Sequence, residues 1–248
     1  NHLLSKIGSY PFEKLNLLLK DIKPSKDVIN LSIGEPKLSA DSKVLDILNK
    51  ETNSFSNYPP MNAVPELSEA YRQYLKSHFG IKNIAEDEVC LVAGTREGTF
   101  SIIQALFNKE NVKEKPYVVM PNPFYQIYGG ATTLAGGEAK FLDCPEKDNF
   151  QPDLDSLKSE DWQKCQILVL CSPNNPTGSV LPLSKLKDIL DLADKYDFYV
   201  VSDECYVDLY TSEKSCPSIL QASSDRSDRL VALHSLSKRS NLPGFRSG

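Results

Sequence analysis

The sequence predicts an α/β protein of three layers, in which helices cover both faces of a mostly parallel β-sheet. Along the middle of the chain, short runs rich in β-branched residues alternate with longer stretches whose apolar residues recur at helical spacing. Each of these helical stretches stands between two candidate strands, where a parallel sheet needs a crossover helix. The length of 248 residues is sufficient for one large domain or two ordinary ones.

The predicted elements follow one another from the N-terminus. The helices expected before the alternating region cover residues 11–22, 41–51 and 65–80. Pro65 and Gly80 suit the start and the end of the third helix. The predicted strands cover residues 88–94, 115–121, 138–144, 166–173, 198–204 and 229–235, and the helices between them cover residues 96–109, 124–136 and 181–197. We expect residues 1–50 to form a separate layer or arm and residues 51–248 to form the large domain.

The bulk composition argues against several classes of protein. Hydrophobic residues make up 40% and charged residues 25% of the chain, and the net charge is -5. These values are typical of a soluble globular protein without a dominant basic surface, so we expect no nucleic-acid partner. No apolar run approaches membrane-spanning length, so we expect a cytoplasmic protein without a membrane anchor. The six cysteines form no C-x-x-C pair, and no histidine cluster lies near them in the sequence, so we expect reduced thiols and no metal site.

Polar residues that close the predicted strands are the candidates for chemistry, because ligands of open α/β sheets bind beyond the carboxyl ends of the strands. The relevant stretches are GTREG at 94–98, SPNNPTG at 172–178, SDECY at 202–206 and SLSK at 235–238. GTREG joins a strand to a helix, so its free N–H groups and the helix dipole favour an anion. An ordinary tight turn with Thr95 as N-cap explains the same pattern.

Three residues in these stretches each have two interpretations. Asp203 follows an apolar run, so its buried charge needs a cation, which is either a structural ion-pair partner or the protonated ring nitrogen of a cofactor. Tyr206 points into the same cavity or is an ordinary core tyrosine. Lys238 follows another apolar run, and partial burial favours the neutral, nucleophilic amine that a Schiff base requires; a solvated surface lysine is the alternative.

Arg246 follows the turn NLPG and also has two interpretations. Together with Ser235 and Ser237 it supplies the guanidinium and hydroxyl donors of a phosphate clamp. A solvated basic cluster with Arg239 is the other interpretation.

In this order and spacing, SPNNPTG, SDECY and SLSK resemble the class I and II aminotransferases, fold-type I enzymes that use pyridoxal 5′-phosphate. The resemblance covers nearly the whole chain, from LSIGEP at 31–36 to SLSKRSNLPGFRSG at 235–248. It implies the cofactor-binding large domain of that fold, with part of a smaller domain formed by the N-terminal segment. The opening YPFEKL and the final stretch look most like the N-succinyldiaminopimelate aminotransferases of bacterial lysine and cell-wall precursor synthesis.

The resemblance implies a role for each candidate residue. Lys238 is the Schiff-base lysine and the proton shuttle, and Asp203 keeps the pyridine nitrogen of the cofactor protonated. Tyr206 and Asn175 donate hydrogen bonds to the phenolate oxygen, and Tyr125 stacks on the ring. The phosphate is held by Thr95, Arg96, Ser235, Ser237 and Arg246, with Tyr58 reaching the phosphate of the neighbouring subunit. The substrate carboxylate approaches Gly34 and Asn175, and a homodimer with shared active sites is implied.

The chain departs from the pattern of this family in two places. Asn62 and Ala63 stand where family members usually have glycine, so we expect a different loop shape there. The family also continues beyond the equivalent of Gly248 with the rest of the sheet and a C-terminal domain, which carries the arginine that pairs with the α-carboxylate of the substrate. We therefore expect a truncated gene product, or a longer protein of which this chain is a part.

The leading functional hypothesis is an aminotransferase in which glutamate is the expected donor and N-succinyl-2-amino-6-oxopimelate the expected keto-acid acceptor. Transamination of other amino acids, such as aspartate, alanine or an aromatic amino acid, is the nearest alternative. A carbon–sulfur lyase on the same scaffold is a second, because the same bound cofactor supports elimination of a β-substituent. A non-catalytic, cofactor-binding regulatory module is a third.

Overall fold

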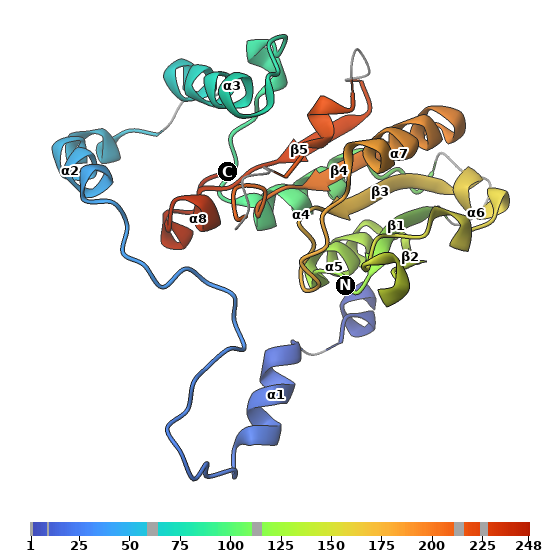
Figure 1. The fold of residues 1–248 in the computed structure, drawn as a ribbon, viewed down its shortest axis with the longest axis horizontal. Helices are drawn as coiled ribbons and strands as arrows, with labels where there is room; N and C mark the ends of the chain where they lie inside the picture. Colours follow the sequence, from blue (N-terminus) through green and yellow to red (C-terminus); the bar gives the residue numbers. More distant parts are fainter. Residues whose placement is uncertain (1, 9, 59–63, 111–115, 211–215, 224–227) are drawn as a thin grey trace.

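A five-stranded parallel sheet forms the centre of the molecule (Figure 1). The computed structural model describes residues 2–8, 10–58, 64–110, 116–210, 216–223 and 228–248. The strand order is β2-β1-β3-β4-β5. The strands are β1 (Tyr117–Asn122), β2 (Glu138–Asp143), β3 (Cys165–Cys171), β4 (Tyr199–Asp203) and β5 (Leu230–Leu233). The predicted parallel sheet is thus confirmed for these five strands.

Helices cover both faces of the sheet, as the sequence predicts. Helices α4 (Thr95–Leu106) and α5 (Gln126–Ala135) pack on one face, and α6 (Ser159–Gln163) and α7 (Leu183–Tyr196) pack on the other. Neighbouring residues of a strand point to opposite faces. Val118 accordingly joins the cluster under α4 and α5, whereas Val119 joins the cluster under α6 and α7. Burial on both faces explains why the central strand β3 is a nearly continuous apolar run.

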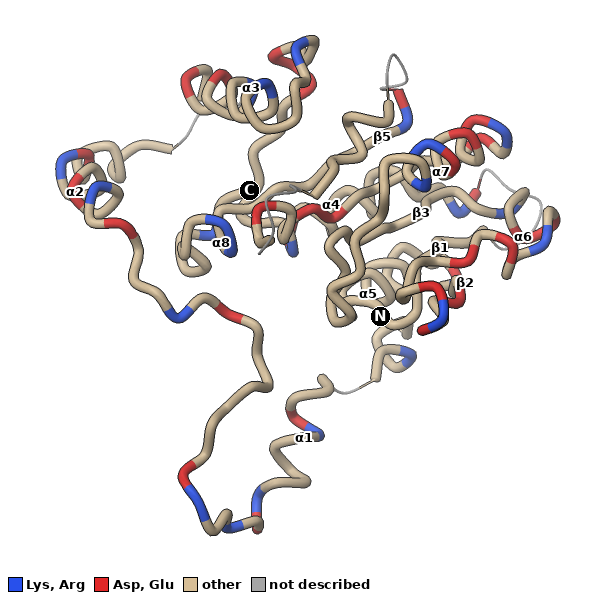
Figure 2. Tube along the Cα trace, viewed as in Figure 1, with Lys and Arg blue, Asp and Glu red and all other residues tan. Residues whose placement is uncertain are grey.

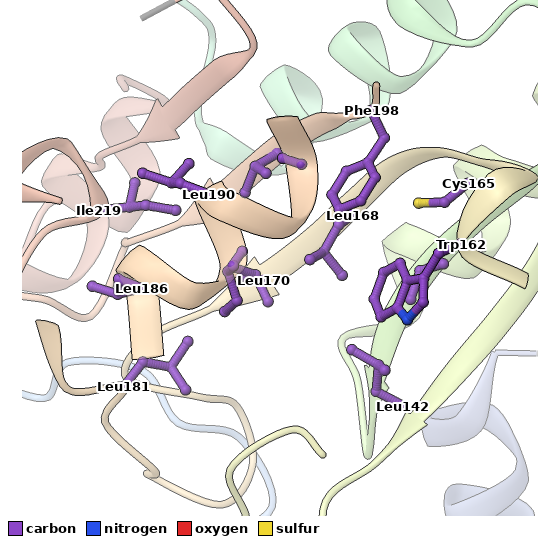
Figure 3. Close-up of a cluster of buried hydrophobic side chains, with 14 of the residues drawn as sticks. Leu142, Trp162, Cys165, Leu168, Leu170, Leu181, Leu186, Leu190, Phe198 and Ile219 are labelled. Carbon is purple, nitrogen blue, oxygen red and sulfur yellow. The ribbon is translucent and has the colours of Figure 1, made fainter. Parts of the chain in front are cut away.

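A cluster of buried apolar side chains lies beneath α6 and α7 (Figure 3). Trp162 of α6 stacks on Phe198 with ring centroids 5.5 Å apart, and both side chains are buried. Leu186 and Ile189 of α7 are 1% and 0% exposed. Aromatic burial of this extent contributes about 3–5 kcal/mol per ring relative to alanine. Trp162 and Phe198 precede β3 and β4, so their stacking joins the amino ends of these two strands.

The strand predicted at residues 88–94 is absent. A 3₁₀ turn covers Glu86–Glu88, and the chain then runs without a sheet ladder to α4. Val92 and Gly248 exchange two backbone hydrogen bonds, of 2.9 and 3.1 Å. One such pair does not make a strand, because a strand needs a continuous row of partners along its length. The prediction was wrong because a strand also requires such a neighbouring segment, and only Val89 and Gly94 of this stretch are buried.

The predicted N-terminal helices are present with shorter bounds. Helices α1 (Pro11–Leu19) and α2 (Ser42–Lys50) contain no buried residue, and Figure 1 shows a long irregular segment between them. Helix α3 (Pro65–Phe79) begins at the expected proline and ends at Gly80, whose φ of 73° is the left-handed conformation that glycine adopts without strain. A last short helix, α8, covers Leu236–Arg239. The 3₁₀ turns cover His2–Lys6, Thr52–Ser56, Glu86–Glu88, Glu146–Asp148, Leu154–Ser156, Ile219–Gln221 and Pro243–Phe245.

Charged residues of both signs are interspersed along α3 and α7 (Figure 2). None of the helices formed by the described residues has the length and apolar character that a membrane span requires. All six cysteines are free thiols.

Candidate active site

The carboxyl ends of the strands open into a cleft of ≈ 1120 Å³. The strand register places Cys171, Asp203 and Leu233 side by side at this edge. The strand order also reverses direction between β1 and β3, which is where open α/β sheets bind their ligands. The predicted site residues that line the cleft are Gly34, Thr95, Arg96, Tyr125, Asn175, Asp203, Tyr206, Ser235, Ser237, Lys238 and Arg246.

Lys238 lies in α8, the helical turn that follows β5, and its amine points into the cleft. The Nζ atom donates a hydrogen bond to the carbonyl oxygen of Gly34 at 2.5 Å and lies 5.8 Å from the centre of the Tyr206 ring. The side chain of Ser235 caps the turn by accepting a hydrogen bond from the N–H of Ser237 at 3.1 Å. A half-buried amine with one backbone partner is available for chemistry once that carbonyl is displaced.

Asp203 ends β4 and carries a buried carboxylate, 5% exposed. Its Oδ2 atom accepts a hydrogen bond from the Tyr128 hydroxyl at 2.8 Å, and its Oδ1 atom accepts one from the N–H of Cys205 at 3.2 Å. Among the described residues, no lysine, arginine or histidine forms an ion pair with Asp203. Burial raises the pKa of Asp203 above its ordinary value, and the bond from Tyr128 opposes that rise. The site therefore holds a carboxylate that lacks a cation.

Tyr128 is a site residue that the sequence interpretation missed. It lies on α5, is 0% exposed, and contacts the edge of the Tyr125 ring with centroids 5.8 Å apart. Burial raises the pKa of Tyr128 well above its ordinary value, so its hydroxyl stays protonated and acts as a donor to Asp203. In the sequence it is one aromatic residue among several on an amphipathic helix, which is the usual pattern of a core residue.

We expect Tyr128→Phe to change the pH dependence of stability in the cofactor-free protein. The pKa of Asp203 is raised in the folded state. The contribution of this residue to the free energy of unfolding is therefore greatest below the ordinary aspartate pKa of about 3.9, and it falls as the pH rises through the folded-state pKa. Loss of the donated hydrogen bond raises this pKa further and costs about 2 kcal/mol at neutral pH. Urea unfolding across a pH series measures both effects. In an Asp203→Asn background, Tyr128→Phe should leave the pH dependence unchanged.

The two asparagines of SPNNPTG have different surroundings. Asn174 is buried, and its Nδ2 atom donates to the hydroxyl of Thr177 at 2.9 Å, which braces the loop internally. Asn175 extends into the cleft, where its Nδ2 atom donates to the Tyr206 hydroxyl at 3.3 Å. Burial raises the pKa of Tyr206 above its ordinary value, so this phenol also keeps its proton near neutral pH. Asn175 and Tyr206 thus present two polar groups at one point of the cleft.

The N-terminus of α4 forms the anion-attracting end of the cleft. Gly94, rather than Thr95, is the N-cap, and Thr95 is the first helical residue. Arg246 approaches this turn so closely that a Cβ atom at Gly94 would collide with its guanidinium group. In this structure the Nη2 atom of Arg246 pairs with Glu97 Oε2 at 2.6 Å, and both side chains are substantially exposed. A guanidinium group beside free helix N–H groups suits a phosphate.

We expect Gly94→Ala to destabilise the protein by about 1–3 kcal/mol and to displace Arg246. The φ of 97° at Gly94 is strained for any residue with a Cβ atom, and the added methyl group collides with the guanidinium. Urea unfolding measures the loss. Gly130→Ala is the matched control, because Gly130 lies in α5 with no atom within 4 Å of its would-be Cβ. That substitution should be neutral or stabilise by up to about 1 kcal/mol, and equal effects of both would contradict the argument.

The roles predicted for Arg96, Gly34 and Tyr58 stay predictions. Arg96 donates through Nε to the Tyr125 hydroxyl at 2.9 Å, so in this structure it orients that ring. No atom lies within 4 Å of a would-be Cβ at Gly34, so the space for a substrate carboxylate is open there. Tyr58 is 100% exposed and lies outside the cleft. Residues 62 and 63, where the chain departs from the family pattern, fall outside the described residues.

Residues 26–248 match the protein family described as aminotransferase class I and II. Over 248 residues, the chain is 30% identical to the LL-diaminopimelate aminotransferase of Aquifex aeolicus, covering 99% of this chain and 62% of that protein. The solved structure of an aminotransferase from Neisseria meningitidis is 40% identical, with a TM-score of 0.92 over 99% of this chain and 63% of that one. A probable N-succinyldiaminopimelate aminotransferase from Thermus thermophilus is 30% identical, with a TM-score of 0.78 over 89% and 58% of the respective chains. The chain spans less than two thirds of the length of these relatives.

Proposed function

The chain belongs to the class I and II aminotransferases, and from this premise we propose that its cleft binds pyridoxal 5′-phosphate and serves the transfer of an amino group between an amino acid and a keto acid. The observation that carries the proposal is the presence in one cleft of an available amine, Lys238, and a buried carboxylate without a cation, Asp203. Neither residue alone would indicate this chemistry. Together they match the two positions at which this cofactor requires protein partners.

The residues of the cleft fit the cofactor at both of its ends. A protonated pyridine nitrogen supplies the positive charge that the buried Asp203 lacks. At the other end, the first turn of α4 offers free N–H groups, and Arg246 offers a guanidinium for a phosphate. When bound, pyridoxal phosphate supplies an electron sink that stabilises negative charge at the α-carbon of the substrate.

The residues of the chain itself would bind, orient and move protons. Lys238 would hold the cofactor through Nζ, and its amine would carry the proton at the α-carbon of the substrate. Asp203 keeps the ring nitrogen protonated. Tyr206 and Asn175 donate hydrogen bonds toward the phenolic oxygen of the cofactor, which the raised pKa of Tyr206 favours. Tyr125, fixed by its bond from Arg96, covers one face of the ring.

The phosphate would be held where three segments of the chain meet. Thr95 contributes from the N-terminus of α4, Ser235 and Ser237 from the turn that carries Lys238, and Arg246 from the final segment. Arg246 would exchange its exposed partner Glu97 for the phosphate. Because Ser237 and Lys238 are adjacent, the same turn that binds the phosphate also aims the amine.

For substrates, we propose glutamate as the amino donor and N-succinyl-2-amino-6-oxopimelate as the keto-acid acceptor. Two of the compared relatives support this choice, since the names of both contain diaminopimelate, with and without the succinyl group. The opening YPFEKL and the stretch SLSKRSNLPGFRSG support the succinylated form. Gly34 and Asn175 would contact the substrate carboxylate.

The decisive assay supplies pyridoxal phosphate and glutamate to the protein that contains this chain, and then compares succinylated, acetylated and unmodified acceptors. We expect a visible absorption band from the bound cofactor, and the fastest 2-oxoglutarate formation with the succinylated acceptor. A protein that stays colourless with added cofactor would refute the proposed chemistry. Equal rates with all acceptors, or preference for an aspartate-derived one, would refute the proposed substrate while leaving the transaminase intact.

We further propose that the protein acts as a homodimer whose N-terminal arm, residues 1–50, covers a partner. Large apolar side chains of this arm are exposed, including Leu18 at 75%, Ile29 at 83% and Leu31 at 87%. An apolar surface of this kind is typical of a binding interface. Tyr58 is fully exposed and is free to reach the phosphate site of the partner. Sedimentation analysis should show a dimer, and a monomer at micromolar concentration would count against this arrangement.

A further inference from the structure

Behind the cleft, three polar side chains from distant parts of the sequence form a chain of contacts. Glu204 Oε2 lies 3.1 Å from His234 Nε2, and His234 Nδ1 lies 2.5 Å from the hydroxyl oxygen of Tyr71, which belongs to α3. The side chains of Glu204 and His234 are 1% and 6% exposed. None of these three residues lines the cleft.

Each member of this contact chain is held from several sides. The Oε1 atom of Glu204 accepts hydrogen bonds from the Ser202 hydroxyl at 3.0 Å and from the N–H of Ile219 at 2.8 Å. The imidazole of His234 lies among aromatic rings of α3, with centroid distances of 5.6 Å to Tyr71, 5.9 Å to Tyr74 and 6.0 Å to Phe79. Among the described residues, Glu204 Oε2 and His234 Nε2 lie close together but form no hydrogen bond, so the network is held by the hydrogen bonds at Glu204 Oε1 and by the contact of His234 Nδ1 with Tyr71.

The contact between Glu204 and His234 links two residues of the cleft through their sequence neighbours. Glu204 directly follows Asp203, and His234 directly precedes Ser235. Successive residues in extended backbone point to opposite sides, so Asp203 and Ser235 face the cleft while their neighbours meet behind it. The N–H of Glu204 also donates to the carbonyl of Leu233 at 2.9 Å. The ends of β4 and β5 are therefore tied together behind the cleft.

We propose that Glu204, His234 and Tyr71 are positioning residues that fix the distance between Asp203 and Ser235. The inference rests on the proposed function, in which Asp203 binds the ring nitrogen of pyridoxal phosphate and Ser235 its phosphate. These are opposite ends of one rigid molecule, so both contacts are made together only when their protein partners are correctly spaced. The network acts through Asp203 and Ser235 and does not touch the cofactor.

A double-mutant cycle on cofactor binding tests this role. His234→Gln should raise the dissociation constant of pyridoxal phosphate about tenfold when Asp203 is present. In an Asp203→Asn background the same substitution should raise it less than about threefold, because the ring-nitrogen contact that His234 positions is already lost. Equilibrium dialysis well below the unfolding temperature of each variant gives the four constants. An equal factor in both backgrounds indicates a merely structural effect and overturns the proposal, as does no effect in either.

A gentler variant and a matched control keep the test decisive. If His234→Gln does not fold, Tyr71→Phe removes only the hydroxyl that His234 contacts, and it should give about a threefold effect that disappears without Asp203. Tyr74→Phe removes a hydroxyl one turn along the same helix, where the partner is Asp208 Oδ2 at 2.9 Å. The factor for Tyr74→Phe should be the same in both backgrounds. If Tyr74→Phe were coupled to Asp203→Asn as strongly as Tyr71→Phe is, the positioning role would be contradicted.

The outcome also separates this inference from the proposed function. A wild-type protein that does not bind pyridoxal phosphate overturns both. A wild-type protein that binds it, and loses affinity on Asp203→Asn without coupling to either network variant, overturns the positioning role alone.

Discussion

Replacing Lys238 by alanine is expected to lower turnover by on the order of 10⁵-fold and to abolish the visible absorption band of the bound cofactor. The Nζ atom is the amine that lies between the Gly34 carbonyl and the Tyr206 ring inside the cleft. Under the proposed function, its loss removes both the covalent attachment of the cofactor and the group that carries the proton. Stopped assays with glutamate, together with absorption spectra of the dialysed protein, measure the two effects.

Two variants separate nucleophilic chemistry from charge. Lys238→Arg retains a cation, but a guanidinium group stays protonated and cannot attack, so this variant should be as inactive as Lys238→Ala. Lys37→Ala removes a neighbouring lysine whose side chain is 73% exposed and pairs with Glu35, so its activity should stay within about twofold of wild type. A small primary amine added to Lys238→Ala should restore part of the rate. Retention of the absorption band in Lys238→Ala would show that another group holds the cofactor.

The centre of the sheet was predictable because β3 and β4 are buried on both faces. In β3, Ile167 and Val169 pack under α4 and α5, while Leu168 and Leu170 pack under α6 and α7, so the run is apolar throughout. The stretch 88–94 has a similar run but lacks a ladder, because its backbone partner at Val92 is the single residue Gly248. An apolar run in the sequence indicates contact with other apolar groups, but it does not show whether another segment lies alongside to complete a ladder.

The motifs at the strand ends identified several of the residues that line the cleft. Asp203 ends the apolar strand β4, Asn175 lies in the loop that follows β3, and parallel topology brings such positions to one edge. Tyr128 reaches Asp203 from a helix on the face of the sheet, which no local pattern reveals. The contact between Glu204 and His234 depends on β4 and β5 being neighbours in the sheet, a fact of topology that short motifs do not contain.

The buried carboxylate explains how the fold and the proposed chemistry constrain each other. Tyr128 and the N–H of Cys205 partly compensate the charge of Asp203, yet its pKa remains raised because burial dominates. An aspartate whose charge was already balanced by a cation of the protein would gain little from pairing with a protonated ring nitrogen. The cofactor-free protein therefore carries a local destabilisation that a cationic ligand removes, which is the pattern of a binding site formed at the expense of stability.

Asp203→Asn is accordingly expected to have opposite effects on stability and on function. Without cofactor, the variant should be more stable than wild type at neutral pH by about 1 kcal/mol, because it removes a buried charge that lacks a cation. The gain should vanish below about pH 4, where the wild-type carboxyl is protonated in both the folded and the unfolded states. With cofactor, the stabilisation on binding should shrink and turnover should fall by about 10³-fold, since the ring nitrogen loses its anionic partner.

The matched control for this prediction is Asp208→Asn. Asp208 Oδ2 pairs with Arg239 Nε at 2.9 Å and accepts the hydroxyl of Tyr74, so neutralising it breaks an existing ion pair. That variant should lose about 1 kcal/mol of stability with and without cofactor. Thermal unfolding of both variants at pH 4 and pH 7.5, with and without pyridoxal phosphate, distinguishes the two cases. If Asp203→Asn instead destabilises the cofactor-free protein as Asp208→Asn does, then a cation within the protein already serves Asp203, and the ring nitrogen is not its partner.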